Sequence, residues 1–184
     1  SLADKNFTIA VNVTGDDGEA IEAVTTDELF AGVILPEAKL TVTDSTVELG
    51  TANAGVQTIN SEKPLEAVTV SESFTLIGDR TTVLGNEHED GAKITVAENK
   101  TLTLGLANGS GGGTIQGSID GSGNLAVAGG DFAVNGGIET KTLNVAAGAA
   151  LTTTSVTLAA NSTVSGALTV ESLVLNSGTV TVEG

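Results

Sequence analysis

The chain contains no cysteine, methionine, tryptophan or tyrosine, only 2 prolines, one histidine and one arginine. Without cysteine there is no disulfide framework and no thiol chemistry, which leaves the redox compartment open. One histidine without cysteine is a poor set of zinc ligands. An aromatic content of 2% leaves no aromatic platforms for sugar rings. These absences exclude most enzyme classes, and we assign no catalytic residue, cofactor or metal ligand from the sequence.

Positive charge is also scarce. Seven Lys and Arg residues face 23 Asp and Glu residues, which gives a formal net charge of −16 at pH 7. Such a surface repels phosphate backbones and anionic lipid, so we expect no nucleic-acid partner. No apolar run is long enough to cross a bilayer, so we expect no membrane insertion. Ser1 begins no signal peptide, and the chain is expected to be a mature or excised piece.

The residues that are abundant favour β-structure. Thr is the commonest residue type and Gly follows with 24, while hydrophobic residues make up 40% of the chain and are almost wholly Val, Leu, Ile and Ala. Thr and the branched aliphatic residues favour strands, and frequent Gly marks frequent turns. The composition therefore predicts an all-β protein.

A short phrase recurs along the chain: a strand, a tight bend and a second strand, clearest in residues 94–104 (ITVAENKTLTL). Its copies begin at Leu40, Val68, Ile94, Leu125, Leu143, Val156 and Leu173. A Ser, Asn or Gly stands at the same place in each bend, namely Ser45, Ser73, Asn99, Gly130, Gly148, Asn161 and Gly178. A sharp bend needs a left-handed residue or a side chain that bonds its own backbone. This periodicity predicts a stacked solenoid.

The spacing of the copies sets the expected number of coils. The intervals are 28, 26, 31, 18, 13 and 17 residues. The first three fit one full coil each, whereas the last three are too short for a coil and are expected to mark successive faces. The prediction is a parallel β-helix of about five to seven coils, because a repeat of this size cannot bury its apolar face alone.

Residues 1–39 depart from this pattern. Alternating apolar residues from Phe7 to Val13 predict one half-buried strand, and Ala20–Phe30 could form a short helix. A solenoid must cover its first open layer. We therefore expect residues 1–39 to be a cap or an irregular first coil, and residues 40–184 to be the β-helix.

Two stretches resemble a known family. Residues 113–137 (GTIQGSIDGSGNLAVAGGDFAVNGG) and 167–184 (ALTVESLVLNSGTVTVEG) are similar to the passenger repeats of bacterial autotransporters and related large surface adhesins. The shared features are an Ile-x-Gly-x-Gly-x-Leu phrase, a Gly-Gly bend and a second alternating strand. The family's Lys-Thr-Gly element is missing, with Ala126–Ala128 in its place. The resemblance implies a right-handed parallel β-helix on the cell surface, exported through an outer-membrane domain that follows the passenger, and a chain that is a fragment of a longer passenger.

The one candidate site is a possible acidic ladder. Asp44, Glu72 and Glu98 each stand two residues past the second apolar residue of a copy. If the coils stack in that register, neighbouring carboxylates lie about 4.8 Å apart. Like charges opposed across strands are destabilising, so the ladder needs splayed side chains, Lys partners or a cation. Three solvated carboxylates and a calcium or partner site are both open; a calcium site requires melting that depends on calcium.

A second acidic stretch, residues 85–91 (GNEHEDG), contains the only histidine, His88. Oxygen-rich loops attract hard cations, but this spacing does not match an EF-hand. We interpret it as a solvated acidic excursion.

The expected function is non-catalytic: adhesion or self-association of a secreted surface protein, with host surface molecules or sister passengers as partners. A purely structural stalk that carries a binding domain elsewhere is the main alternative. Two minor alternatives are a polysaccharide-active β-helix enzyme and an ice-binding solenoid, the latter because units such as Thr101-Leu102-Thr103 and Thr179-Val180-Thr181 would project threonines in rows.

Overall fold

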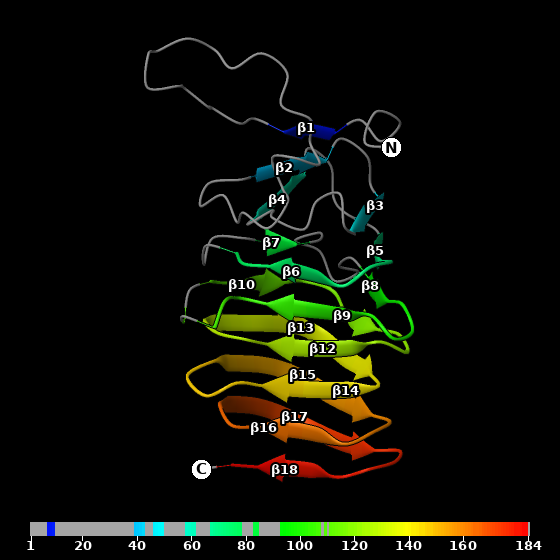
Figure 1. Cartoon of the computed structure of the whole chain (residues 1–184), viewed down its shortest axis with the longest axis vertical. Helices are drawn as coiled ribbons and strands as arrows, with labels where there is room; N and C mark the ends of the chain where they lie inside the picture. The colour runs from blue at the N-terminus through cyan, green and yellow to red at the C-terminus, as the bar shows by residue number, and fades with distance from the viewer. Residues whose placement is uncertain are drawn as a thin grey trace.

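The protein is an all-β, right-handed parallel β-helix of about five turns (Figure 1). It was analysed as a computed structural model. The structure describes residues 7–9, 39–42, 46–49, 58–61, 67–78, 83–84, 93–107, 109 and 111–183. Within these residues no helix is long and apolar enough to cross a membrane. The predicted fold class and the predicted number of coils are confirmed.

One face of the solenoid is a parallel six-stranded sheet, whose strands stack one below another in Figure 1. It consists of β6 (Phe74–Leu76), β9 (Thr101–Leu104), β12 (Asn124–Val127), β14 (Thr142–Val145), β16 (Ser162–Val164) and β18 (Val180–Val182). Apolar and polar residues alternate along these strands, and the apolar side chains point inward. Phe74, Leu102, Leu125 and Leu143 form one such inward stack in direct register.

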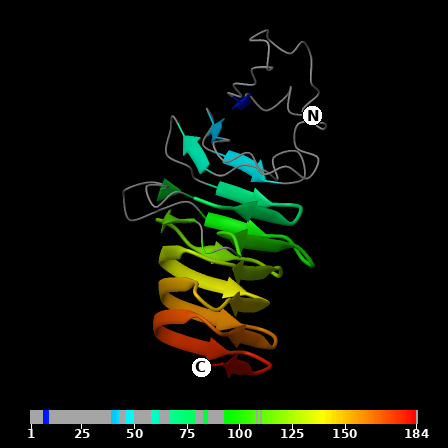
Figure 2. The same cartoon turned by 60° about the vertical axis from the view of Figure 1, so that its left-hand side comes forward.

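The rest of the solenoid wall is a nine-stranded sheet. Its strands are β3 (Thr46–Leu49), β5 (Ala67–Val70), β7 (Val83–Leu84), β8 (Lys93–Val96), β10 (Gly112–Ile115), β11 (Ile119–Asp120), β13 (Asp131–Thr140), β15 (Ala150–Leu158) and β17 (Ala167–Leu175). The first half of β13 pairs with β10, and its second half pairs with β11. The long strands β13, β15 and β17 therefore wrap around a corner and supply two faces each (Figure 2).

A third sheet contains β1 (Phe7–Ile9), β2 (Lys39–Val42) and β4 (Thr58–Ser61). β1 pairs antiparallel with β2, and β2 pairs parallel with β4. The strand predicted from Phe7 is present as far as Ile9. Val11, Val13 and the helix expected at Ala20–Phe30 lie outside the described residues, and the division into residues 1–39 and 40–184 stays a prediction.

The register corrects the expected coil boundaries. Leu125 pairs directly with Leu143, and Val156 pairs directly with Leu173, so intervals of 18 and 17 residues are complete coils. The expectation that they are too short was wrong because a coil closes with very small corners. Between Thr140, the last residue of β13, and Thr142, the first of β14, only Lys141 intervenes.

Two of the aligned copies were also assigned to the wrong neighbour. Ile94 pairs with Ile119 and not with Leu125, which pairs with Leu102. Val68 pairs with Val47, whereas Leu40 belongs to the third sheet and pairs with Ile59. The same apolar alternation occurs on more than one face, so the repeated phrase alone does not identify the face.

The core is a continuous column of Val, Leu, Ile and Phe side chains. Leu49, Val96, Leu104, Leu125 and Val127 are each no more than 1% exposed. Each such side chain contributes about 1.5–3 kcal/mol by leaving water. Every coil covers the next, so burial is shared along the axis.

Three inward positions hold polar residues, and each bonds to backbone. The Thr140 hydroxyl donates to the carbonyl of Thr142, and the Thr153 hydroxyl donates to the carbonyl of Gly136. Ser162 accepts the backbone N–H of Leu143 at 3.0 Å and donates to the carbonyl of Ala160. Among the described residues, all buried side-chain polar atoms have a hydrogen-bond partner, as buried polar groups require.

Candidate functional site

The structure places two members of the acidic ladder. Val70 of β5 pairs with Val96 of β8, so Glu72 and Glu98 follow the same rung by two residues each. Asp44 lies outside the described residues, as does the whole of residues 85–91 with His88. Both described carboxylates are on exposed residues in the bends that lead toward the six-stranded sheet.

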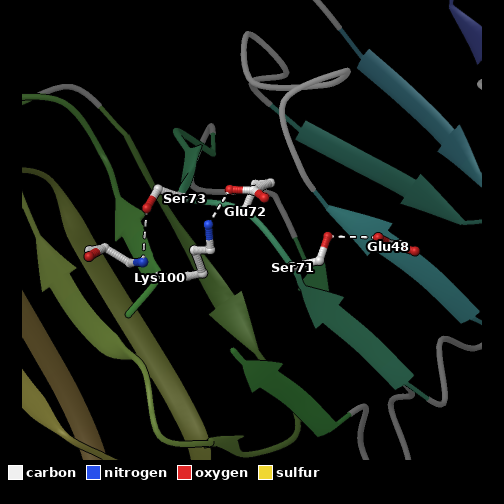
Figure 3. Close-up of polar contacts among 6 residues, drawn as sticks. Glu48, Ser71, Glu72, Ser73 and Lys100 are labelled. Carbon is white, nitrogen blue, oxygen red and sulfur yellow. Dashed lines mark hydrogen bonds and ion pairs between the residues drawn. The ribbon is translucent and has the colours of Figure 1, made fainter. Parts of the chain in front are cut away.

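Glu72 is paired with a cation. Lys100, in the bend of the following coil, lies 2.5 Å from Glu72, nitrogen to oxygen (Figure 3). Its side chain is 32% exposed and that of Glu72 is 52% exposed. An ion pair this exposed is worth at most about 1 kcal/mol. The lysine partner that a stack of carboxylates requires is therefore present at Glu72.

Hydroxyl groups bridge the same bends. The Ser71 hydroxyl donates to Glu48 at 2.7 Å, and the Ser73 hydroxyl accepts the backbone N–H of Thr101 at 3.1 Å (Figure 3). Ser73 therefore bonds the backbone of the next coil, where its own backbone had been expected. Asn161 does the same, because its side-chain oxygen accepts the N–H of Thr179 at 3.1 Å.

The other bend residues act through their backbone conformation. Asn99 has φ 60°, and Gly130, Gly148 and Gly178 have φ between 75° and 85°. These four confirm the predicted left-handed bends. Ser73 and Asn161 are not left-handed, and Ser45 lies outside the described residues.

A closer acidic pair lies on the nine-stranded sheet. Asp120 of β11 pairs in register with Glu139 of β13, so two carboxylates occupy adjacent rungs. Lys93 of β8 lies 2.7 Å from Asp120. The hydrogen bond to Asp120 and the attraction of its negative charge raise the pKa of Lys93, and Glu139 raises it further. Sequence reasoning missed this cluster because it followed the bends and not the outward strand positions, where alternation would have located it.

A shallow groove of about 330 Å³ runs along the corner where the nine-stranded sheet turns into the six-stranded sheet. Side chains from successive coils line it, including Glu98, Ser122, Glu139, Lys141, Thr157 and Asn176. The Gly-x-Gly of the recurring phrase builds its floor. A Cβ on Gly121 would come within 2.2 Å of the Val96 carbonyl oxygen, and one on Gly123 within 2.4 Å of the Ala97 carbonyl oxygen. Only glycine allows the coils to approach this closely.

The groove brings together charges that the ladder did not. Glu98 shares it with Glu139 and Lys141, which come from coils further along the axis. Among the described residues, no group of three or more His, Cys, Asp or Glu side chains is placed to hold a metal ion. The calcium interpretation of the ladder stays a prediction, since Asp44 is not described.

The outer face of the six-stranded sheet contrasts with these charged corners. None of the residues in its six strands is ionisable. We name this surface the neutral face, and its central column in direct register is Thr75, Thr103, Ala126, Asn144, Thr163 and Thr181. The strands of the nine-stranded sheet, in contrast, contain Glu48, Lys93, Asp120, Asp131, Glu139 and Glu171.

Polar groups on the neutral face bond to one another from rung to rung. The Thr142 hydroxyl donates to the Asn124 side-chain oxygen at 2.9 Å. The Asn144 side-chain oxygen accepts the backbone N–H of Thr163 at 3.2 Å. These bonds hold short side chains against the sheet. The face is therefore polar in composition, flat and uncharged.

Comparison with known proteins gives no relative for this chain: no family model, no curated protein and no solved structure matches it.

Proposed function

We propose that this protein is a non-catalytic segment of a secreted bacterial surface protein, and that it acts in adhesion or self-association through the outer surface of its β-helix. The observation that carries the proposal is the uninterrupted register from β9 to β18. It presents outward side chains in straight columns over successive coils. Such repeating columns offer an extended binding surface, as solenoids generally do. The resemblance of residues 113–137 and 167–184 to passenger repeats supports the bacterial cell surface as the location.

The proposal is tested by binding. Purified protein, fluorescently labelled at an added terminal tag, should bind to host epithelial cells or to bacteria that display the same chain. The control is a β-helix protein of similar length and net charge from an unrelated source. Saturable binding above that control supports the proposal. Absence of binding to cells together with absence of self-association in solution would overturn it.

A structural stalk is the second candidate, and one observation favours it. From β12 onward the connections between strands are no longer than four residues, as between β14 and β15 or between β17 and β18. A bare, smooth rod of this kind suits a spacer. A spacer should show neither cell binding nor self-association, so the same experiment separates the two functions.

A further inference from the structure

We propose that the neutral face is the surface through which two copies of this chain associate. This inference rests on the proposed function and identifies the surface and the partner for its self-association. Two molecules of net charge −16 repel each other at every orientation that brings carboxylates together. The six-stranded sheet is the one whose strands hold no ionisable residue among the described sheets of the solenoid wall. A second copy approaches there at the least electrostatic cost.

The polar groups of the neutral face also lower the cost of removing water. A polar group that leaves water without a partner is costly. Here Thr142 and Asn124 satisfy each other, and Asn144 and Asn161 accept backbone N–H groups of the next coil. These groups keep their bonds when a second surface covers them. Short Thr, Asn and Ala side chains further allow two flat sheets to pack face to face, about 10 Å apart.

The size of the face sets the strength of the contact. Six rungs spaced about 4.8 Å apart and about three residues wide, at about 3.3 Å per residue, give roughly 250–300 Å² on each copy. Stable interfaces bury about 800 Å² per partner. The contact between two copies is therefore weak and becomes appreciable only at high local concentration.

The charge argument gives a distinctive dependence on salt. Ionic strength screens the repulsion between the two acidic molecules, with a Debye length of about 10 Å at 0.1 M. Self-association through the neutral face should therefore strengthen as NaCl is raised from about 0.05 M to about 0.5 M. An interface built on ion pairs would weaken over the same range.

The test uses the full chain in analytical ultracentrifugation across a concentration series. The double variant Thr103→Glu/Thr163→Glu should lose association by about tenfold or more, because it opposes like charges across the interface. The matched control is Thr95→Glu, an exposed outward threonine on β8 of the nine-stranded sheet, which should associate like the wild type. Circular dichroism and thermal melting establish that each variant is folded.

A charge-reversal experiment keeps the proposal falsifiable if the glutamate variant folds poorly. Thr103→Lys/Thr163→Lys mixed with Thr103→Glu/Thr163→Glu should associate more tightly than either variant alone. Wild-type association in the glutamate variant would overturn the assignment of the face while leaving self-association intact. Cell binding without any self-association would overturn the inference while leaving the proposed function intact. Thermal hysteresis of ice growth that is lost in the glutamate variant, without self-association, would assign the face to ice and overturn a second copy as its occupant.

Discussion

At the scale of single residues, two glycines of ordinary backbone conformation meet very different surroundings. A Cβ on Gly123 would lie 2.4 Å from the backbone carbonyl of Ala97 and 2.5 Å from a Val96 methyl group. A Cβ on Gly137 would meet only the flexible hydroxyl of Ser155 within 3.4 Å. We expect Gly123→Ala to lower the free energy of unfolding by about 1–3 kcal/mol through overpacking. Gly137→Ala should change it by no more than about 1 kcal/mol.

Urea unfolding followed by circular dichroism measures both changes. The comparison isolates the contact itself, because neither glycine has a left-handed φ. Equal losses for the two variants would mean that close approach of the coils at Gly123 does not determine stability.

Lys93 gives a prediction about pH. Its folded-state pKa is raised by Asp120, above the value of about 10.4 expected for an unfolded chain. A raised lysine pKa contributes stability that is fully present below pH 10.4 and is lost as the pH rises through the folded-state pKa. Lys93→Gln should therefore melt at a lower temperature than the wild type at pH 7–9, and the difference should shrink above about pH 10.4.

Lys141→Gln serves as the control for this pH series, because Lys141 forms no ion pair among the described residues. Its melting temperature relative to the wild type should not follow the same trend. A difference for Lys93→Gln that stays constant from pH 7 to pH 11 would contradict the role of its charge.

At the scale of elements, the strands β15 and β17 place chemically identical residues in different surroundings. Leu158 and Leu175 occupy the same position in paired strands. Leu158 is 1% exposed and Leu175 is 42% exposed. Leu158→Ala should cost about 2–5 kcal/mol of unfolding free energy because it leaves a cavity between two coils. Leu175→Ala should cost less than half as much, and the difference in urea midpoint between the two variants measures it.

The strands themselves were largely predictable, and their pairing was not. Alternation located β5, β8, β9, β12 and β14, since inward apolar residues such as Leu102 and Leu104 recur at every second position. The face of each strand was less clear, because the same alternation occurs on all sides of the solenoid. Corners as short as Lys141 carry no turn signal in the sequence. The coil length of 17–19 residues therefore emerged only from the register.

Ser162 shows a further limit at this scale. It stands at an inward position of β16 where the pattern favours an apolar side chain, and it is 3% exposed. It is tolerated because it accepts the Leu143 N–H and donates to the Ala160 carbonyl. Both partners come from other parts of the fold, so the sequence around Ser162 does not reveal them.

At the scale of the whole molecule, the fold class followed from composition and repetition, whereas the distribution of charge did not. The sequence places the acidic residues mainly in residues 1–100, with net −12. The structure shows a separation by face, because outward residues of the six-stranded sheet come from six different segments. Thr75 and Thr181 are far apart in sequence but belong to one column. The candidate surface depends on that register and was beyond reach of a linear pattern.

The parallel register also determines how the molecule responds to force. The backbone hydrogen bonds between neighbouring coils, such as those joining β15 to β17, run along the solenoid axis. A pull along that axis therefore loads the bonds of one coil in sequence, as a zipper opens, and does not shear many strands at once. Leu151 pairs with Leu168, seventeen residues later, so each opened coil releases roughly 60 Å of chain at about 3.3–3.6 Å per residue. A tether built in this way would lengthen in even increments under tension.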